Sequence, residues 1–181
     1  MADPLLAKKL SECGRALAVA AVPAFTSPKG VHPQTVIAGC ARMAGTYLFR
    51  SFELKLPDPV PGQPVLSAEA AANTPALLQT CAGIVKDLGT SIASAPDGSL
   101  DSAKHKTQQD FLQTQAILDP LFVPIRKTYE LNNRQMALAA AIGTGMLVHL
   151  FAKHLNPNVG FGVAAVAFTE GSKTIPAPLE E

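Results

Sequence analysis

The feature that most constrains the fold of this chain is a recurring pair in which a residue able to cap a helix precedes a proline. Proline lacks a backbone N–H and has a fixed φ, which suits the first position of a helix. Each pair introduces apolar residues at helical rather than alternating spacing. The pairs are Asp3-Pro4, His32-Pro33, Thr74-Pro75, Asp119-Pro120 and Asn156-Pro157. They predict an all-α chain.

The apolar spacing predicts a bundle of about six helices. Two of the expected helices begin at Pro4 and near Ser102. The other four are expected to cover residues 33–51, 75–88, 134–154 and 157–170. Because Pro120 and Pro124 lack the N–H that a helix interior uses, we expect a break before residues 125–131 resume as helix. The last two helices are expected to form an apolar C-terminal hairpin.

Two connectors separate the predicted helices, and a tail follows the last of them. Segment 52–66 holds prolines at near-alternate positions, and proline and the residue before it both avoid helix, so we expect an extended strap. Such a strap either covers one end of the bundle or, in an oligomer, reaches a neighbouring subunit. Residues 91–105 predict a mobile loop, and residues 173–181 a polar tail that follows a single domain of residues 1–172.

Composition limits the classes of partner. Fifteen Lys and Arg against 14 Asp and Glu leave a net charge of +1 without a basic block, so we expect no nucleic-acid partner. Charged residues make up only 16% of the chain, against about 25% in ordinary soluble domains. A surface with few charges favours burial in an assembly, so we expect self-association, and a second protein as a further candidate partner.

Small residues recur every four positions on two of the predicted helices. Ala137, Ala141 and Gly145 lie on one of them, and Ala41 and Gly45 on the other. Small side chains let helix backbones approach closely, so we expect these two helices to meet tightly. The same pattern serves a core, a dimer interface or a membrane hairpin, and does not choose between them.

The three cysteines, Cys13, Cys40 and Cys81, are far apart and lie within apolar helical patterns. They predict buried free thiols in a reducing compartment, and therefore a cytoplasmic protein. Basic residues before the apolar stretch 16–25 resemble a signal peptide superficially. The Asp3-Pro4 helix start and the amphipathic spacing that follows favour a helix of the domain and no export.

The candidate ligand site is a polar stripe formed by Arg42, Thr46 and Arg50, which recur every four residues on an otherwise apolar helix. Two guanidinium groups on one face suit a carboxylate or phosphate. The alternative is that each arginine pairs with a carboxylate of the protein itself, Arg50 with Glu53 for example. If a small anion binds between helices, these residues and His149, as a proton carrier, are its predicted contacts.

No catalytic residue, metal site or cofactor is predicted. His149 and His154 do not form a metal-binding pair, because a five-residue separation turns them about 140° apart around a helix. The sequence contains no phosphate-binding loop, nucleophile elbow or metalloprotease motif. This pattern favours a protein that is not an enzyme.

Three functions are compatible with these features. The favoured one is a non-catalytic helical interaction or assembly protein that forms a homo-oligomer. The second is an enzyme or sensor that binds a small anionic molecule through Arg42, Thr46, Arg50 and His149. The third is a membrane-active protein that inserts residues 136–168, since residues 136–152 are uncharged and reach the short end of a bilayer span; a buried core hairpin is favoured over insertion.

Overall fold

The computed structural model describes residues 3–93 and 106–179, and within these ranges the chain forms six helices and one short β-hairpin. In chain order the elements are α1 (Pro4–Ala24), β1 (Thr26–Ser27), β2 (Gly30–Val31), α2 (Pro33–Arg50), α3 (Ala68–Asp87), α4 (Phe111–Thr128), α5 (Asn133–Leu150) and α6 (Pro157–Ser172). The predicted all-α, single-domain fold is confirmed.

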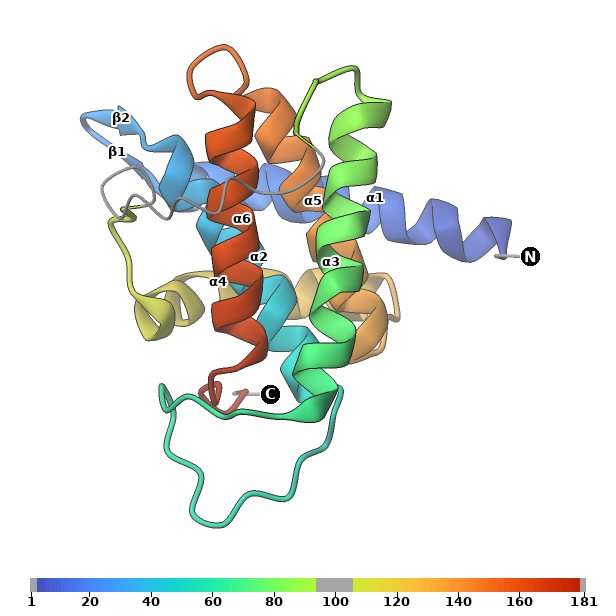
Figure 1. Cartoon of the computed structure of the whole chain (residues 1–181), viewed down its shortest axis with the longest axis vertical. Helices are drawn as coiled ribbons and strands as arrows, with labels where there is room; N and C mark the ends of the chain where they lie inside the picture. Colours follow the sequence, from blue (N-terminus) through green and yellow to red (C-terminus); the bar gives the residue numbers. More distant parts are fainter. Residues whose placement is uncertain (1–2, 94–105, 180–181) are drawn as a thin grey trace.

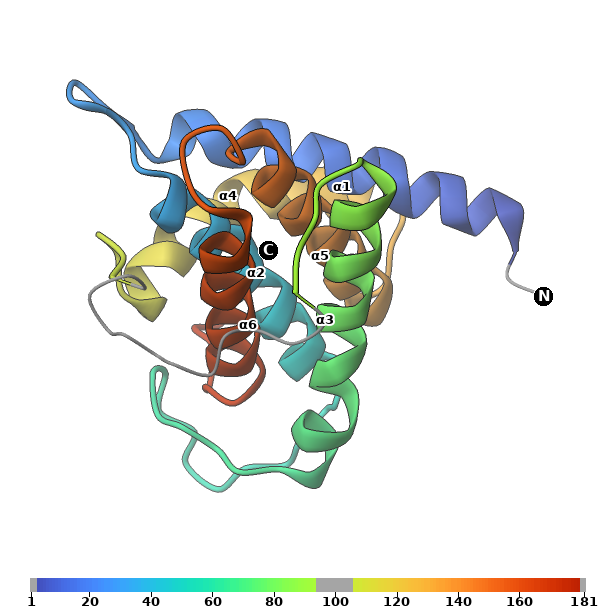
Figure 2. The ribbon, with the colours of Figure 1, turned by 45° about the horizontal axis from the view of Figure 1, so that its top comes forward.

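Helix α2 lies at the centre of the bundle (Figure 1). It packs along α6 and α5, while α5 also contacts α1 and α3. Residues 35–49 of α2 are all buried, so its polar stripe is inside the molecule. Helix α1 crosses one side of the bundle and extends beyond it at its N-terminal end (Figure 2).

Side-chain caps fix the starts of most helices. Capping side chains accept a hydrogen bond from a backbone N–H in the first turn. They belong to Asp3, Ser67, Asp110, Asn132 and Asn156. His32 precedes α2 without such a bond, and its Nδ1 instead contacts the Thr35 Oγ1 at 2.8 Å. The starts predicted at Pro4, Pro33 and Pro157 are confirmed.

Two predicted helix starts are wrong. Helix α3 begins at Ala68 and contains Pro75, and α4 runs from Phe111 to Thr128 without the break predicted at Pro120 and Pro124. All three prolines are exposed, so their rings need no space in the core and water can hydrate the carbonyl groups that they leave unpaired. Ser102, where the fourth helix was expected to begin, lies outside the described residues, but residues 106–110 are not helical and α4 begins only at Phe111, which Asp110 caps.

Helices α5 and α6 follow each other in the chain as predicted, but each makes its main contacts with other helices rather than with the other member of the hairpin. Helix α6 packs chiefly on α2, whereas α5 packs chiefly on α1 and α2. None of the helices in the described ranges is long and apolar enough to span a bilayer, and this includes α5 and α6, which cover most of residues 136–168.

Glycines allow the closest helix crossings. Helices α2 and α5 pack against each other as expected, but the glycines of the two small-residue stripes face other helices. A Cβ added to Gly45 would lie 2.5 Å from the carbonyl oxygen of Phe168, so the helix that meets Gly45 is α6 and not α5. On α5, a Cβ at Gly143 would lie 2.6 Å from the carbonyl oxygen of Gly14 on α1. The small residues of α2 and α5 therefore serve different crossings within one core.

The connector of residues 52–66 lies at one end of the bundle (Figure 1). Its second half pairs with the chain beyond α6, where the Gly62 N–H donates to the Ile175 carbonyl at 2.8 Å and the Val65 N–H to the Lys173 carbonyl at 2.6 Å. Thr174 and Ile175 are buried. The segment predicted as a polar tail is therefore packed against the domain as far as it is described. Most of the predicted loop 91–105 lies outside the described residues.

Candidate functional site

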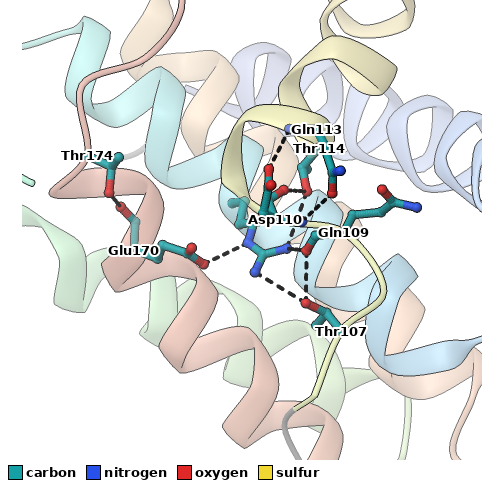
Figure 3. A network of polar contacts seen from close by, with 8 residues as sticks. Thr107, Gln109, Asp110, Gln113, Thr114, Glu170 and Thr174 are labelled. Carbon is teal, nitrogen blue, oxygen red and sulfur yellow. Dashed lines mark hydrogen bonds and ion pairs between the residues drawn. The ribbon is translucent and has the colours of Figure 1, made fainter. Parts of the chain in front are cut away.

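Helix α2 places the Arg42 guanidinium in the interior, where the residue is only 8% exposed. Its Nε donates to the Glu170 Oε2 at 2.7 Å, and its Nη1 donates to the Gln109 carbonyl at 2.7 Å. Longer hydrogen bonds, each 3.3 Å, reach the hydroxyl groups of Thr114 and Thr107. Figure 3 shows these partners around one guanidinium group. The Arg42 network thus joins α2 to α6 and to the segment that leads into α4.

The start of α4 contributes a second layer to this network. Asp110 caps the helix through the Gln113 N–H at 2.8 Å, and the Gln113 side chain accepts from the Asp110 N–H at 3.0 Å (Figure 3). The Thr114 hydroxyl donates to the Asp110 carbonyl at 2.7 Å. Arg42 therefore contacts a segment whose own hydrogen bonds hold its shape.

Arg50, two turns further along α2, forms a separate ion pair. Its Nη1 and Nη2 donate to the two carboxylate oxygens of Asp119 at 3.1 and 2.9 Å, and its Nη2 also reaches the Ala177 carbonyl at 3.1 Å. The guanidinium carbon lies 5.2 Å from the ring centre of Tyr47. The carboxylate partner of Arg50 is thus Asp119 on α4, not Glu53.

The other two predicted ligand contacts do not join the arginines. Thr46 is fully buried, and its hydroxyl has no hydrogen-bond partner within the described ranges. His149 is exposed, and its Nδ1 contacts the Thr90 Oγ1 at 2.7 Å beyond the end of α3. The residues predicted as one anion site therefore occupy separate environments: two ion pairs, a buried hydroxyl and a surface imidazole.

The three cysteines are free and buried, as predicted. Burial raises the pKa of the Cys13 thiol to about 11 and that of Cys40 to about 12, and it also raises the pKa of Cys81. Neutral thiols are poor nucleophiles at physiological pH. In the described part of the chain, no cluster of three His, Cys, Asp or Glu side chains is placed to hold a metal ion.

A hollow with a volume of about 590 Å³ lies along one face of α4. We call it the α4 groove. One wall is the α4 face, and the other is formed by the connector and the chain beyond α6. The lining residues are Pro61, Leu112, Gln115, Ala116, Asp119, Pro120, Val123, Pro124, Ala177, Pro178 and Leu179.

The α4 groove is mainly apolar. Of its two polar side chains, Asp119 pairs with Arg50, and the Gln115 Oε1 accepts from the Ala177 N–H at 2.9 Å. Leu112 remains 40% exposed at the groove wall. A hollow of this size and polarity suits an apolar partner rather than a small anion.

A smaller hollow of about 440 Å³ lies between α3 and α6. Its lining includes Thr74, Leu78, Phe161 and Lys173, of which Lys173 is the charged side chain. It is separate from the α4 groove, since the two share no lining residue.

Sequence reasoning did not find the α4 groove. The spacing of Leu112, Ala116, Asp119 and Val123 follows one helix face and was visible in the sequence. The prediction of a break at Pro120 and Pro124 divided this face into two short pieces. The opposite wall comes from segments far away in the chain, and no local pattern shows that they meet here.

Comparison of the chain with protein-family models, curated proteins and solved structures finds no match.

Proposed function

We propose that the protein acts by binding rather than by catalysis, and that it forms a homodimer through the α4 groove. The observation that carries the proposal is the groove itself, an apolar hollow of about 590 Å³ with Leu112 40% exposed at its wall. Contiguous apolar surface of this kind marks interaction sites. A chain with 16% charged residues has few charges with which to solvate such a face.

The internal ion pairs favour this function over the binding of a small anion. A ligand carboxylate at Arg42 or Arg50 would have to displace Glu170 or Asp119, whose distances to the guanidinium groups are 2.7 and 2.9 Å. Both arginines are largely buried, and the Asp119 side chain is only 17% exposed, so a displaced Asp119 carboxylate would lose its charged partner away from bulk water. A partner that docks in the α4 groove does not have to break either ion pair.

Sedimentation velocity and native mass spectrometry over a range of protein concentrations test the proposal. We expect a dimer for the wild-type chain, and a shift to monomer for Leu112→Glu, because a carboxylate in the groove would lose its hydration when the second copy docks. The matched control is Val166→Glu on α6, where the native side chain is 39% exposed, against 40% for Leu112.

Circular dichroism and urea unfolding establish that both variants fold. A wild-type chain that stays monomeric at all concentrations overturns the proposal. A dimer that Val166→Glu dissociates and Leu112→Glu leaves intact would place the interface elsewhere, and would also contradict it.

A further inference from the structure

The hollow of about 440 Å³ between α3 and α6, which we call the α3–α6 hollow, has chemically different ends. The two helices run side by side in opposite directions (Figure 1 and Figure 2). Next to Lys173, the hydroxyl groups of Thr74 and Ser172 lie 2.7 Å apart and align the end of α6 with the first half of α3. Phe161 lies about three turns earlier on α6, about 18 Å away along the axis and toward Ala82. Lys173 and Phe161 therefore mark opposite ends of the hollow.

Lys173 is the charged side chain of the described lining, and it lacks an anionic partner. It is half-buried, and within residues 3–93 and 106–179 its ammonium group forms no ion pair. Glu170, the acidic residue of α6, is already bound to Arg42 at 2.7 Å. The backbone holds Lys173 in place, since its carbonyl accepts from the Val65 N–H at 2.6 Å. Water screens a half-buried charge less than an exposed one, so an anion at this end is stabilised by Lys173.

The rest of the lining offers a ligand few hydrogen-bond donors. The Thr74 hydroxyl donates to the Ala70 carbonyl at 2.7 Å, and the Thr169 hydroxyl donates to the Ala165 carbonyl at 3.0 Å. These two protons are therefore used within the helices. Most of the remaining lining side chains are apolar. A ligand that fills the hollow needs an apolar body and a polar group at one end.

The single cation of the described lining selects the polar group of the ligand. A phosphate group carries up to two negative charges and three acceptor oxygens, whereas a carboxylate carries one charge. The lining offers one ammonium group, which matches the carboxylate. The volume of about 440 Å³ lies within the range of about 300 to 1,000 Å³ that is usual for small-molecule sites.

We propose that the α3–α6 hollow binds a free monocarboxylic acid with an unbranched apolar chain. The carboxylate accepts hydrogen bonds from the Lys173 ammonium group, and the chain lies along α3 toward Phe161. This proposal goes beyond the dimer proposed above, because the hollow and the α4 groove share no lining residue.

Isothermal titration calorimetry with decanoate tests the proposal. We expect one decanoate to bind per chain, and Lys173→Met to raise the dissociation constant about 10-fold, because the charged hydrogen bond is lost while the apolar stem remains. Decan-1-ol has the same chain without the charge, so it should bind wild type and Lys173→Met equally. Butyrate keeps the charge but lacks most of the chain, and should bind wild type at least about 100-fold more weakly than decanoate.

Lys9→Met is the matched control for the loss of charge. Lys9 lies on α1 with its side chain 34% exposed and does not line the hollow. We expect this variant to bind decanoate as the wild type does.

A second pair of variants tests the apolar end. Ala82→Phe places a ring in the hollow and should weaken decanoate binding at least about 10-fold, because the ring takes the space of the chain. Ala76→Phe is its control, since Ala76 is an exposed residue of α3 outside the lining. Circular dichroism and urea unfolding establish that the variants fold.

A wild-type chain that does not bind decanoate overturns the proposal. It is also overturned if Lys173→Met binds decanoate as tightly as wild type, or if Leu112→Glu abolishes the binding, which would place the ligand in the α4 groove. The oligomeric state does not enter this test. A monomeric wild-type chain that binds decanoate through Lys173 therefore overturns the proposed dimer and supports the site in the α3–α6 hollow.

Discussion

Arg42 and Arg50 each carry a buried cluster of charged hydrogen bonds. A guanidinium group has five N–H donors, and a charge taken out of water needs partners for them. Arg42 finds acceptors on α6 and before α4, and Arg50 finds them on α4 and at Ala177. Two residues of one helix therefore hold together segments that are distant in the sequence.

Replacing Arg50 tests the structural role of its ion pair. Arg50→Met leaves the Asp119 carboxylate, whose side chain is 17% exposed, without its bidentate partner. We expect the free energy of unfolding to fall by about 3 kcal/mol, since removal of one member of a buried pair leaves an uncompensated charge. Urea unfolding measures the change.

The double variant Arg50→Met/Asp119→Leu supplies the control for this prediction. It removes both charges and should be more stable than Arg50→Met alone. A single variant as stable as the wild type would show that the Arg50–Asp119 pair does not stabilise the fold.

At the scale of the element, helix crossings depend on glycine. At Gly45 the nearest atoms to an added Cβ are the carbonyl oxygen of Phe168 at 2.5 Å and the Ser172 nitrogen at 2.6 Å. Both belong to the backbone of α6, which cannot turn aside as a flexible side chain can. The separation of α2 and α6 is therefore set by the absence of a side chain at this position.

Gly45→Ala should accordingly force α2 and α6 apart. We expect a loss of about 2 kcal/mol in the free energy of unfolding, because overpacking exceeds the gain in helix propensity. Gly83→Ala in α3 is the matched control, as an added Cβ there has no neighbour within 4 Å in the described structure. Its expected effect is a gain of about 0.5 to 1 kcal/mol. A stabilised Gly45→Ala variant would contradict the crossing geometry.

At the scale of the whole molecule, the chain beyond α6 closes the end of the bundle. Ile175 is buried and exchanges hydrogen bonds with the connector, through the Gly62 N–H at 2.8 Å and the Gln63 carbonyl at 2.9 Å. Ala177 contacts both Arg50 and Gln115. One short segment thus joins the connector, α2 and α4, and provides a wall of the α4 groove.

Removal of residues 174–181 should loosen this end of the molecule. We expect a loss of about 3 kcal/mol from the burial of Ile175 and the hydrogen bonds that it makes. The deletion removes the Ile175 carbonyl, which accepts from the Gly62 N–H. Amide hydrogen exchange should therefore accelerate more at Gly62 than in the centre of α5, where only the global loss of stability acts. Equal acceleration at both places would show that the segment does not specifically hold the connector.

Local chemistry determined much of the fold from the sequence alone. The caps at Asp3 and Asn156 and the helical spacing of the apolar residues predicted all-α structure and several helix starts correctly. The buried free cysteines were predicted for the same reason. Caps and periodicity act within one or two turns, so they are visible in any short stretch of sequence.

Only the tertiary structure decided how these helices meet and what their polar residues do. Pro75, Pro120 and Pro124 were predicted to begin or break helices, yet each lies on an exposed helix face, where packing on the opposite side maintains the helix. The partners of Arg42 and Arg50, Glu170 and Asp119, lie far from them in the sequence. Contacts between distant segments depend on the packing of the whole chain, which no local pattern encodes.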